Sequence, residues 1–280
     1  MTNGGSTRTD VLVDTAWLEE HLHDPGLRVV EVDVSPAAYV EGHLPGAVLW
    51  NVYQDLKDAD YRLVDKAAME RLVERSGIAR NAVVVFYGYA PAIGFWLMRL
   101  FGHTEARILN AGRATWQREG RPWSTDVEQP TQTRYRLPDE DDRIRASQPL
   151  VEQSIGDPGR IILDVRTDPE YRGERFWPSG GLEEGGRPGH IPSAVLIPAD
   201  GLQDADGAFK PAADLRRLYA PIDLASGNEV IPSCTIGGRA CTTWFVLTYL
   251  LGHDHTRVYD GSWAEWGARG DTPVATGPRE

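Results

Sequence analysis

The sequence predicts an α/β fold that occurs twice along the chain. Short apolar segments alternate with amphipathic ones, and the apolar segments at 83–86 and 229–231 are continuous, as strands of buried parallel sheets are. Several blocks of similar sequence also recur at a nearly constant offset. We therefore expect two domains, each with a central, mostly parallel sheet flanked by helices.

The internal repeat sets the predicted domain bounds. Three blocks recur in the same order, 147 to 150 positions later: 42–48 as 189–195, 100–103 as 250–253, and 109–116 as 259–266. We expect one domain at 1–125, a second at 147–280, and a linker rich in Asp, Gln, Thr and Pro at 126–146.

Strands and helices are predicted within each half. The expected strands are 28–33, 83–86, 160–164 and 229–231. One helix is expected from Asp14, a good capping residue, and another from Lys66 until Gly77 ends it. Further helices are expected after Gly94, after Arg239, and around Trp116 and Trp266.

Composition excludes several classes of protein. A formal net charge of −12 and a pI near 5.1 argue against nucleic acid or an anionic membrane as a partner. No apolar run approaches the roughly 20 residues that cross a bilayer, and no secretory signal is visible in the first six residues. Two cysteines are too few for a disulfide framework, so we expect a reducing, cytoplasmic location.

The segment 233–240, Ser-Cys-Thr-Ile-Gly-Gly-Arg-Ala, joins a predicted strand to a predicted helix. Gly237 and Gly238 allow successive amide N–H groups to point inward as a nest for negative charge. The helix N-terminus and Arg239 add positive charge at the same place, which favours the thiolate of Cys234. We predict a nucleophilic cysteine in an anion-binding loop at the carboxyl end of a strand; a buried structural cysteine is the alternative.

The two halves differ where this chemistry would occur. In the first half, Gly88 or a neighbour holds the place of Cys234, and the loop offers no thiol, hydroxyl nucleophile or arginine. We therefore expect the first domain to be inactive.

The second half also has a longer connection before its Gly-His-Ile-Pro block. Asp164 and His190 are 26 positions apart, whereas Asp33 and His43 are 10 apart, which leaves 16 extra residues. They are rich in glycine and arginine, and they predict a lid or substrate-facing loop; a solvated surface loop is the alternative.

These features resemble the rhodanese family of sulfurtransferases, specifically its two-domain thiosulfate:cyanide type, over almost the whole chain. The resemblance rests on the tandem repeat and on Cys234 with Gly237 three positions and Arg239 five positions later. It also rests on the motifs at 42–47, 164–166, 187–192, 243–247 and 260–263. It implies two tandem rhodanese-like domains, of which the second is catalytic.

The resemblance also implies a reaction cycle. The Cys234 thiolate would take the outer sulfur of a small anionic donor such as thiosulfate, release sulfite, and pass the sulfur from a persulfide to a thiophilic acceptor such as cyanide, a thiol or another protein. The amides expected to cradle that sulfur belong to Thr235, Ile236, Gly237, Gly238 and Arg239. Arg239 would either supply charge to the donor or lock the loop onto a carboxylate. Arg172 and Arg175 are candidates for binding the sulfonate, and no metal or organic cofactor is implied.

Position 235 departs from the family pattern. Thiosulfate enzymes usually have Arg directly after the cysteine and mercaptopyruvate enzymes have Gly, whereas this chain has Thr235. The change removes a cation that would help to bind a dianion. It leaves open 3-mercaptopyruvate as the donor, and a persulfide carrier for a biosynthetic partner.

Two further alternatives concern Cys234 itself. The first is phosphatase activity. Phosphatases of the same fold have Arg six positions after the cysteine, so that the loop between them encircles a phosphate. Arg239 is only five positions after Cys234, so the loop is smaller and suits a single sulfur atom. Cys241 could form a disulfide with Cys234, although its place on the following helix favours the core. The seven histidines lack the spacing of metal ligands.

Overall fold

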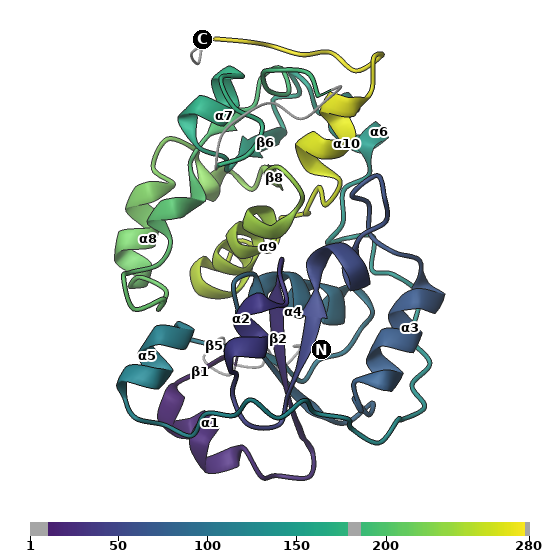
Figure 1. Cartoon of the computed structure of the whole chain (residues 1–280). Coiled ribbons are helices and arrows are strands. Elements are labelled where there is room, and N and C mark those ends of the chain that lie inside the picture. The colour runs from purple at the N-terminus through teal and green to yellow at the C-terminus, as the bar shows by residue number, and fades with distance from the viewer. Residues whose placement is uncertain (1–10, 179–185, 278–280) are drawn as a thin grey trace, which may run out of the picture. The chain divides into compact units, whose positions relative to one another are not determined.

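The computed structural model describes residues 11–178 and 186–277 and divides the chain into two compact units (Figure 1). The first unit contains the chain up to Leu56 together with Val64–Glu140 and Asp204–Phe209. The second contains Lys57–Leu63, Asp141–Gln203 and the chain from Lys210 onward. Each unit thus includes one short segment from the half of the sequence that otherwise forms the other. The predicted domain bounds stay predictions, and residues 179–185 of the predicted lid lie outside the described residues, as do residues 1–10 and 278–280.

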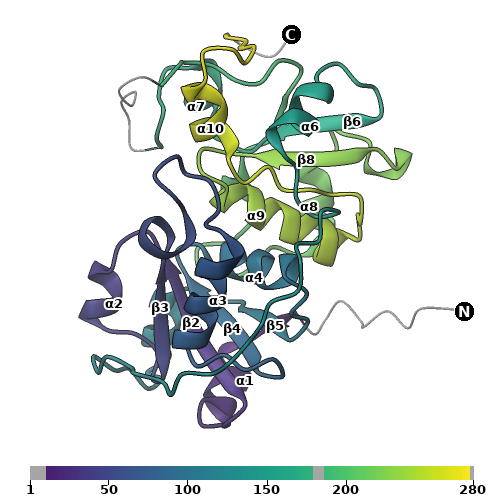
Figure 2. The same cartoon turned by 90° about the vertical axis from the view of Figure 1, so that its right-hand side faces the viewer.

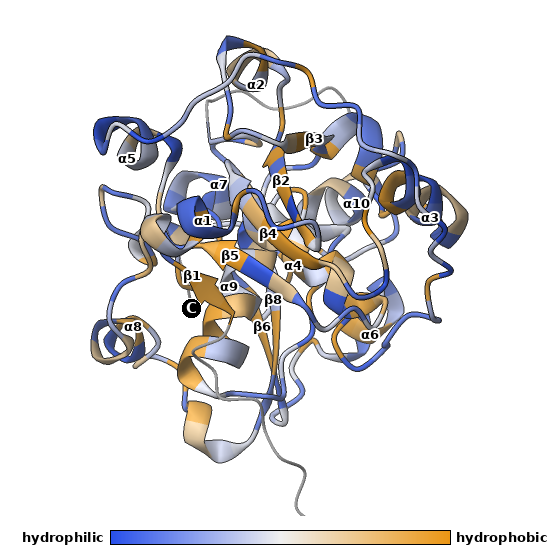
Figure 3. Ribbon diagram, turned by 90° about the horizontal axis from the view of Figure 1, so that it is seen from below, coloured by the Kyte–Doolittle hydropathy of each residue, from blue (hydrophilic) through white to orange (hydrophobic). Residues whose placement is uncertain are grey.

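The first unit is built on a parallel sheet of five strands in the order β1-β5-β4-β2-β3. Its strands are β1 (Leu12–Val13), β2 (Leu27–Asp33), β3 (Ala47–Asn51), β4 (Val83–Gly88) and β5 (Ala106–Leu109). Its helices are α1 (Thr15–His21), α2 (Ala37–Glu41), α3 (Lys66–Arg75), α4 (Pro91–Leu100) and α5 (Arg113–Arg118), with a π-helical turn η1 at Val52–Leu56. The strands are mainly hydrophobic (Figure 3), because helices bury them.

The second unit has a parallel sheet of three strands in the order β7-β6-β8. Its strands are β6 (Arg160–Asp164), β7 (Val195–Leu196) and β8 (Glu229–Ser233), and β6 and β8 lie side by side in Figure 2. Isolated parallel bridges, Val230 to Thr256 and Arg145 to Val258, continue the pairing beyond β8. Its helices are α6 (Gln148–Gln153), α7 (Asp168–Arg172), α8 (Ala212–Leu218), α9 (Gly238–Phe245) and α10 (Ser262–Ala268), with short turns η2 (Ala199–Gly201), η3 (Leu224–Ser226) and η4 (Val246–Leu251).

The structure confirms the predicted fold class and most predicted elements. Asp14 caps α1 by accepting from the amide of Trp17 at 2.7 Å. Two predicted helix starts were too late. Helix α4 begins at Pro91, before Gly94, because proline suits the first turn of a helix, and α9 begins at Gly238, one residue before Arg239.

Strand register gives an alignment of the two units that differs from the one predicted. Val30 pairs with Val48 of the repeated block, and Leu163 pairs with Val195 at the same place of that block. Residue 30 is therefore equivalent to residue 163, so Glu31 is the counterpart of Asp164. The expectation that Asp33 held that place was wrong by two positions.

The corrected alignment changes the length of the insertion and fixes the counterpart of Cys234. Glu31 precedes His43 by 12 positions and Asp164 precedes His190 by 26, so the second unit has 14 extra residues rather than 16. Val30 also pairs with Phe86, and Leu163 pairs with Pro232. Counting two residues on from Phe86 and from Pro232 places Gly88 at the position of Cys234.

Gly88 has no room for a side chain. Its φ of +107° lies in the region that favours glycine, and a Cβ there would lie 2.9 Å from the carbonyl oxygen of Val32. The first unit therefore excludes a thiol at the position where the second unit carries one.

We expect Gly88→Cys to lower the free energy of unfolding by about 1–3 kcal/mol, through backbone strain and the clash with Val32. Urea denaturation checks this. The matched control is Gly46→Cys, since Gly46 also has a positive φ (+77°) but open space around its Cβ position. An equal loss of unfolding free energy in the two variants would show that the clash at Gly88 does not contribute to the destabilisation.

Candidate active site

Cys234 follows β8 directly, so it lies at the carboxyl end of a central parallel strand. The amide of Gly237 donates a hydrogen bond to its Sγ at 3.1 Å. Gly237 caps α9 with a φ of +94°, and a Cβ there would lie 2.8 Å from the carbonyl oxygen of Asp260. Only glycine fits this turn, and the turn directs one amide at the sulfur.

The other loop residues predicted around the sulfur have different positions. Thr235 is buried, Ile236 is half-buried against the core of the second unit, and Gly238 is the first residue of α9. Among the described residues, Gly237 supplies the only amide that donates to Sγ. The predicted cradle concerns the outer sulfur of a persulfide, so the roles of the other loop amides stay predictions.

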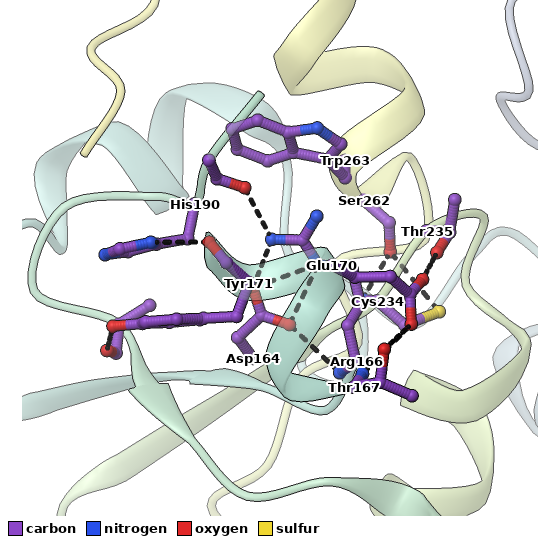
Figure 4. A network of polar contacts seen from close by, with 12 residues as sticks. Asp164, Arg166, Thr167, Glu170, Tyr171, His190, Cys234, Thr235, Ser262 and Trp263 are labelled. Atoms are coloured by element: carbon purple, nitrogen blue, oxygen red, sulfur yellow. Dashed lines mark hydrogen bonds and ion pairs between the residues drawn. The ribbon is translucent and has the colours of Figure 1, made fainter. Parts of the chain in front are cut away.

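Ser262 also contacts Cys234, and sequence reasoning did not single it out as a site residue. Its Oγ accepts from the amide of Cys234 at 3.0 Å, donates to the carbonyl of Tyr259 at 2.8 Å, and lies 4.0 Å from Sγ (Figure 4). Its φ of +53° is uncommon for a residue other than glycine. The only signal was its place in the Asp-Gly-Ser-Trp motif.

An ion pair between the half-buried Arg239 and the buried Glu170 holds the loop in place. Arg239 donates from Nη1 and Nη2 to the two carboxylate oxygens of Glu170, at 2.8 and 2.7 Å. The hydroxyl of Thr235 donates to Glu170 at 2.8 Å and accepts from Arg239 at 2.7 Å. Of the two roles considered for Arg239, the structure therefore describes the lock onto a carboxylate, and its charge is already paired.

Glu170 was not predicted, although its local sequence carries a signal. Thr167 and Glu170 form a capping box at the start of α7, in which the Thr167 amide and hydroxyl donate to the Glu170 carboxylate at 3.0 and 2.7 Å. Burial opposes ionisation of Glu170, but the hydrogen bonds and charge of Arg239, with the Thr167 donors, outweigh it and hold the pKa at about 2.

A second buried pair fixes the turn after β6. Arg166 donates to both carboxylate oxygens of Asp164 and, at 2.9 Å, to the carbonyl of Gly189, while its guanidinium lies 4.7 Å from the centre of the Trp263 ring (Figure 4). His190, which follows Gly189 in the sequence, stacks on Tyr171 with ring centres 3.6 Å apart. The Asp-Val-Arg and Gly-His-Ile-Pro motifs thus support each other and the loop beside them.

The two arginines predicted to bind the sulfonate are exposed and contact nearby residues of their own segment. Arg172 forms an exposed ion pair with Asp168 at 2.8 Å, and Arg175 is exposed and donates to the carbonyl of Pro178 at 3.3 Å. Within the described ranges, neither contacts Cys234. Their role toward a donor stays a prediction.

Cys241 is a free, buried cysteine on α9, and burial raises the pKa of its thiol well above the ordinary value. Cys234 is free as well. Residues 11–178 and 186–277 contain no cluster of three or more His, Cys, Asp or Glu side chains that could hold a metal ion. None of the helices in these ranges is long and apolar enough to cross a membrane.

A cysteine in a strand-to-helix turn of a parallel sheet, with an amide directed at its sulfur, defines a class of α/β proteins with an anion-binding cysteine loop. This chain belongs to the rhodanese family: the model of the Rhodanese-like domain matches residues 14–119 and 147–269. The chain is thus a rhodanese-family sulfurtransferase with two such domains.

Relatives match along nearly the full length of the chain. A protein of Thermus thermophilus named "Sulfur carrier protein TtuD" is 39% identical over 98% of this chain and 99% of its own. A protein of Mycobacterium tuberculosis named "Putative thiosulfate sulfurtransferase SseA" is 40% identical over 95% of this chain and 91% of its own. One of Mycolicibacterium smegmatis, "Putative thiosulfate sulfurtransferase", is 38% identical over 96% and 99%.

Solved structures share the fold at lower sequence identity. EanB in complex with ergothioneine superimposes with a TM-score of 0.87 at 20% identity, covering 98% of this chain and 71% of its own. YnjE superimposes with a TM-score of 0.79 at 22% identity, covering 97% and 70%. At this level of identity the likeness concerns the fold alone.

We expect Glu170→Gln to destabilise the protein by about 3 kcal/mol near neutral pH, because it leaves the half-buried Arg239 without its counter-charge. The pKa of Glu170 is lowered by folding, from 4.5 to about 2, so its contribution is complete above about pH 4.5 and is lost as the pH falls toward 2. Urea denaturation of both proteins at several pH values checks this. A stability difference that stays constant from pH 6 to pH 3 would contradict the linkage.

Proposed function

We propose that this chain moves sulfane sulfur from a donor such as thiosulfate to a thiophilic acceptor such as cyanide or a thiol, through a persulfide on Cys234. The observation that carries the proposal is the amide of Gly237 directed at Sγ, 3.1 Å away, at the carboxyl end of β8. A hydrogen-bond donor such as this amide favours negative charge on the sulfur atom that it contacts. The thiolate is the reactive form of cysteine.

The proposed cycle balances without an oxidant or a reductant. The Cys234 thiolate attacks the outer sulfur of thiosulfate; a bond forms between the two sulfurs, and the bond within thiosulfate breaks with its electron pair leaving on sulfite. The acceptor then attacks the outer sulfur of the persulfide, becomes thiocyanate if it is cyanide, and returns the thiolate. No general base is needed once the thiolate is present.

The surroundings of Cys234 favour a small donor. The residue is 2% exposed, so little of its surface is open to a donor, and a small donor needs the least space to reach Sγ. We also propose that the first domain is inactive, because Gly88 stands at the equivalent position, and that the protein works in the cytoplasm, where thiols stay reduced.

A persulfide carrier for a biosynthetic partner is the second candidate. Thr235 is uncharged, so it places no cation of its own next to Cys234. Its buried hydroxyl is hydrogen-bonded to Glu170 and Arg239. A relative of 39% identity is named a sulfur carrier protein. In this case the sulfur acceptor would be a protein.

The uncharged residue at position 235 also keeps 3-mercaptopyruvate as an alternative sulfur donor.

We expect Cys234→Ala to fold normally and to lose all sulfur transfer, because it removes the proposed nucleophile. Mass spectrometry after incubation with thiosulfate should show one added sulfur atom on Cys234 of the unchanged protein. Cys241→Ala is the matched control and should keep most of the activity. Persulfide or turnover in Cys234→Ala would end the proposed mechanism.

We expect Thr235→Arg to raise kcat/KM for thiosulfate relative to 3-mercaptopyruvate by about tenfold, since a charge-assisted hydrogen bond to the more highly charged donor contributes about 1.5–3 kcal/mol. Steady-state kinetics with both donors check this, with Thr235→Val as the uncharged control.

Transfer of persulfide to a protein acceptor, without turnover of either small donor, would favour the carrier function over the enzyme. Rapid turnover with thiosulfate and cyanide would count against the carrier.

A further inference from the structure

In the first unit, a segment without helix or strand, residues 131–138, lies beside α3. The amide of Tyr135 donates to the carboxylate of Glu74 at 3.3 Å. The amide of Leu137 donates to the carboxylate of Glu70 at 3.0 Å. Both Tyr135 and Leu137 are only 4% exposed. The segment therefore fills a groove beside α3, where it buries one aromatic and one aliphatic side chain.

A buried histidine recognises the tyrosine of this segment. Nε2 of His103 lies 3.0 Å from the carbonyl oxygen of Ala82, and because a carbonyl can only accept, this nitrogen carries the proton. Burial lowers the pKa of His103, which favours the neutral ring. Nδ1 is then the acceptor, and the hydroxyl of Tyr135 donates to it at 2.9 Å.

The second unit has the same histidine in the same setting. Strand register makes Ala82 equivalent to Asn228, and Nε2 of His253 lies 3.0 Å from the carbonyl oxygen of Asn228. By the same reasoning this nitrogen is the donor. His253 is 8% exposed, and no group among the described residues is hydrogen-bonded to its Nδ1. The partner that a tyrosine provides in the first unit is therefore missing from the described part of the second.

Helix α8 is the counterpart of α3, with one change of charge. The same strand register makes Met69 of α3 equivalent to Leu215 of α8, and both side chains are fully buried. The next residue is Glu70 in α3 and Arg216 in α8. A carboxylate that holds the segment in the first unit is thus replaced by a guanidinium in the second.

The equivalent groove of the second unit is an open cavity of about 330 Å³. Residues from α8, from the turn after it and from the end of η4 line it, among them Arg216, Tyr219, Ile222, Leu251 and His253. Arg216 is exposed and forms no ion pair or hydrogen bond with another residue that the structure describes. The cavity therefore combines an apolar lining with one histidine acceptor and one cation that can each take a partner.

The cavity lies away from the cysteine loop along one helix. Helix α9 continues directly into η4, so the cavity adjoins the end of this helical stretch, and Cys234 precedes its start. Changes in the cavity can therefore be made without altering the residues around the sulfur.

We propose that this cavity is a docking groove for an extended segment of a partner protein in which a tyrosine is followed by an acidic residue. The tyrosine hydroxyl donates to Nδ1 of His253, and the acidic side chain pairs with Arg216, as Arg136 pairs with Glu70 in the first unit. The segment of a second copy of this chain does not suit the groove, because its Arg136 would face Arg216. The inference goes beyond the proposed function and does not depend on it.

The test measures the binding of labelled synthetic peptides to the full chain by fluorescence anisotropy. The probe peptide has the sequence of residues 131–139 with Arg136→Glu. One control peptide has the unchanged sequence, and a second carries Tyr135→Phe in addition to Arg136→Glu. Because the whole chain has a net charge of −12, non-specific attraction favours the unchanged peptide, so a preference for the probe peptide is specific.

Three proteins are compared: the unchanged chain, Arg216→Glu and Arg217→Glu. Arg217 is the matched control, because it is the next residue of α8, is paired with Asp214 and is not among the residues that line the cavity. Circular dichroism and urea denaturation check the fold of both variants.

We expect the unchanged chain to bind the probe peptide saturably, with a Kd below about 1 mM. The unchanged peptide should bind about threefold to tenfold more weakly, because its arginine meets Arg216 as a like charge. The peptide with Tyr135→Phe should bind about twofold to tenfold more weakly than the probe peptide, because it lacks the hydroxyl that donates to His253.

The charge reversal decides where the peptide binds. In Arg216→Glu the unchanged peptide should bind more tightly than the probe peptide, whereas Arg217→Glu should keep the order of the unchanged chain. Three results would each overturn the proposal: no saturable binding to the unchanged chain, the same order of peptides in Arg216→Glu, or an equal reversal in Arg217→Glu.

Discussion

The site depends on the close packing of Gly237 against the carbonyl oxygen of Asp260. A side chain on Gly237 would collide with that oxygen, and its positive φ turns the amide toward Cys234. The contact joins the turn after β8 to the turn before α10, so it brings Ser262 to the Cys234 amide as well. The cysteine loop is therefore shaped as much by the end of the chain as by its own glycines.

Around this contact, the unit surrounds the sulfur with paired charges. Glu170 and Asp164 are buried carboxylates, and each is held by an arginine that reaches it from a neighbouring turn or helix. Such pairs contribute little net stabilisation, because desolvation offsets their attraction, but they are costly to break and so they fix geometry. The arginine five positions after the cysteine is one of these two, so its charge is already paired with a carboxylate.

The sequence was sufficient to predict the fold and the glycine-containing turn after Cys234, because both depend on patterns of neighbouring residues. Continuous apolar strands predict a parallel sheet, and glycines around a cysteine predict an anion-binding turn. What sequence reasoning missed depends on contacts between distant positions. Glu170 is 69 positions from Arg239, and Lys57 is 203 positions from Asp260, so no local spacing indicates either pair. The wrong acidic residue was aligned with Asp164 because Glu31 and Asp33 lie two positions apart on one strand, and the register of β2 against its neighbours distinguishes them.

The two units do not follow a simple cut of the chain. Lys57–Leu63 belongs with the second unit and Asp204–Phe209 with the first. A fragment that begins after the linker would contain Cys234, Arg239 and Glu170, yet it would lack the lysine that binds Asp260. Dissecting this protein into halves at the predicted linker, or exchanging one half with that of a relative, would therefore separate residues that belong to one compact unit. Each half of the sequence supplies one short segment to the unit that the other half mainly forms.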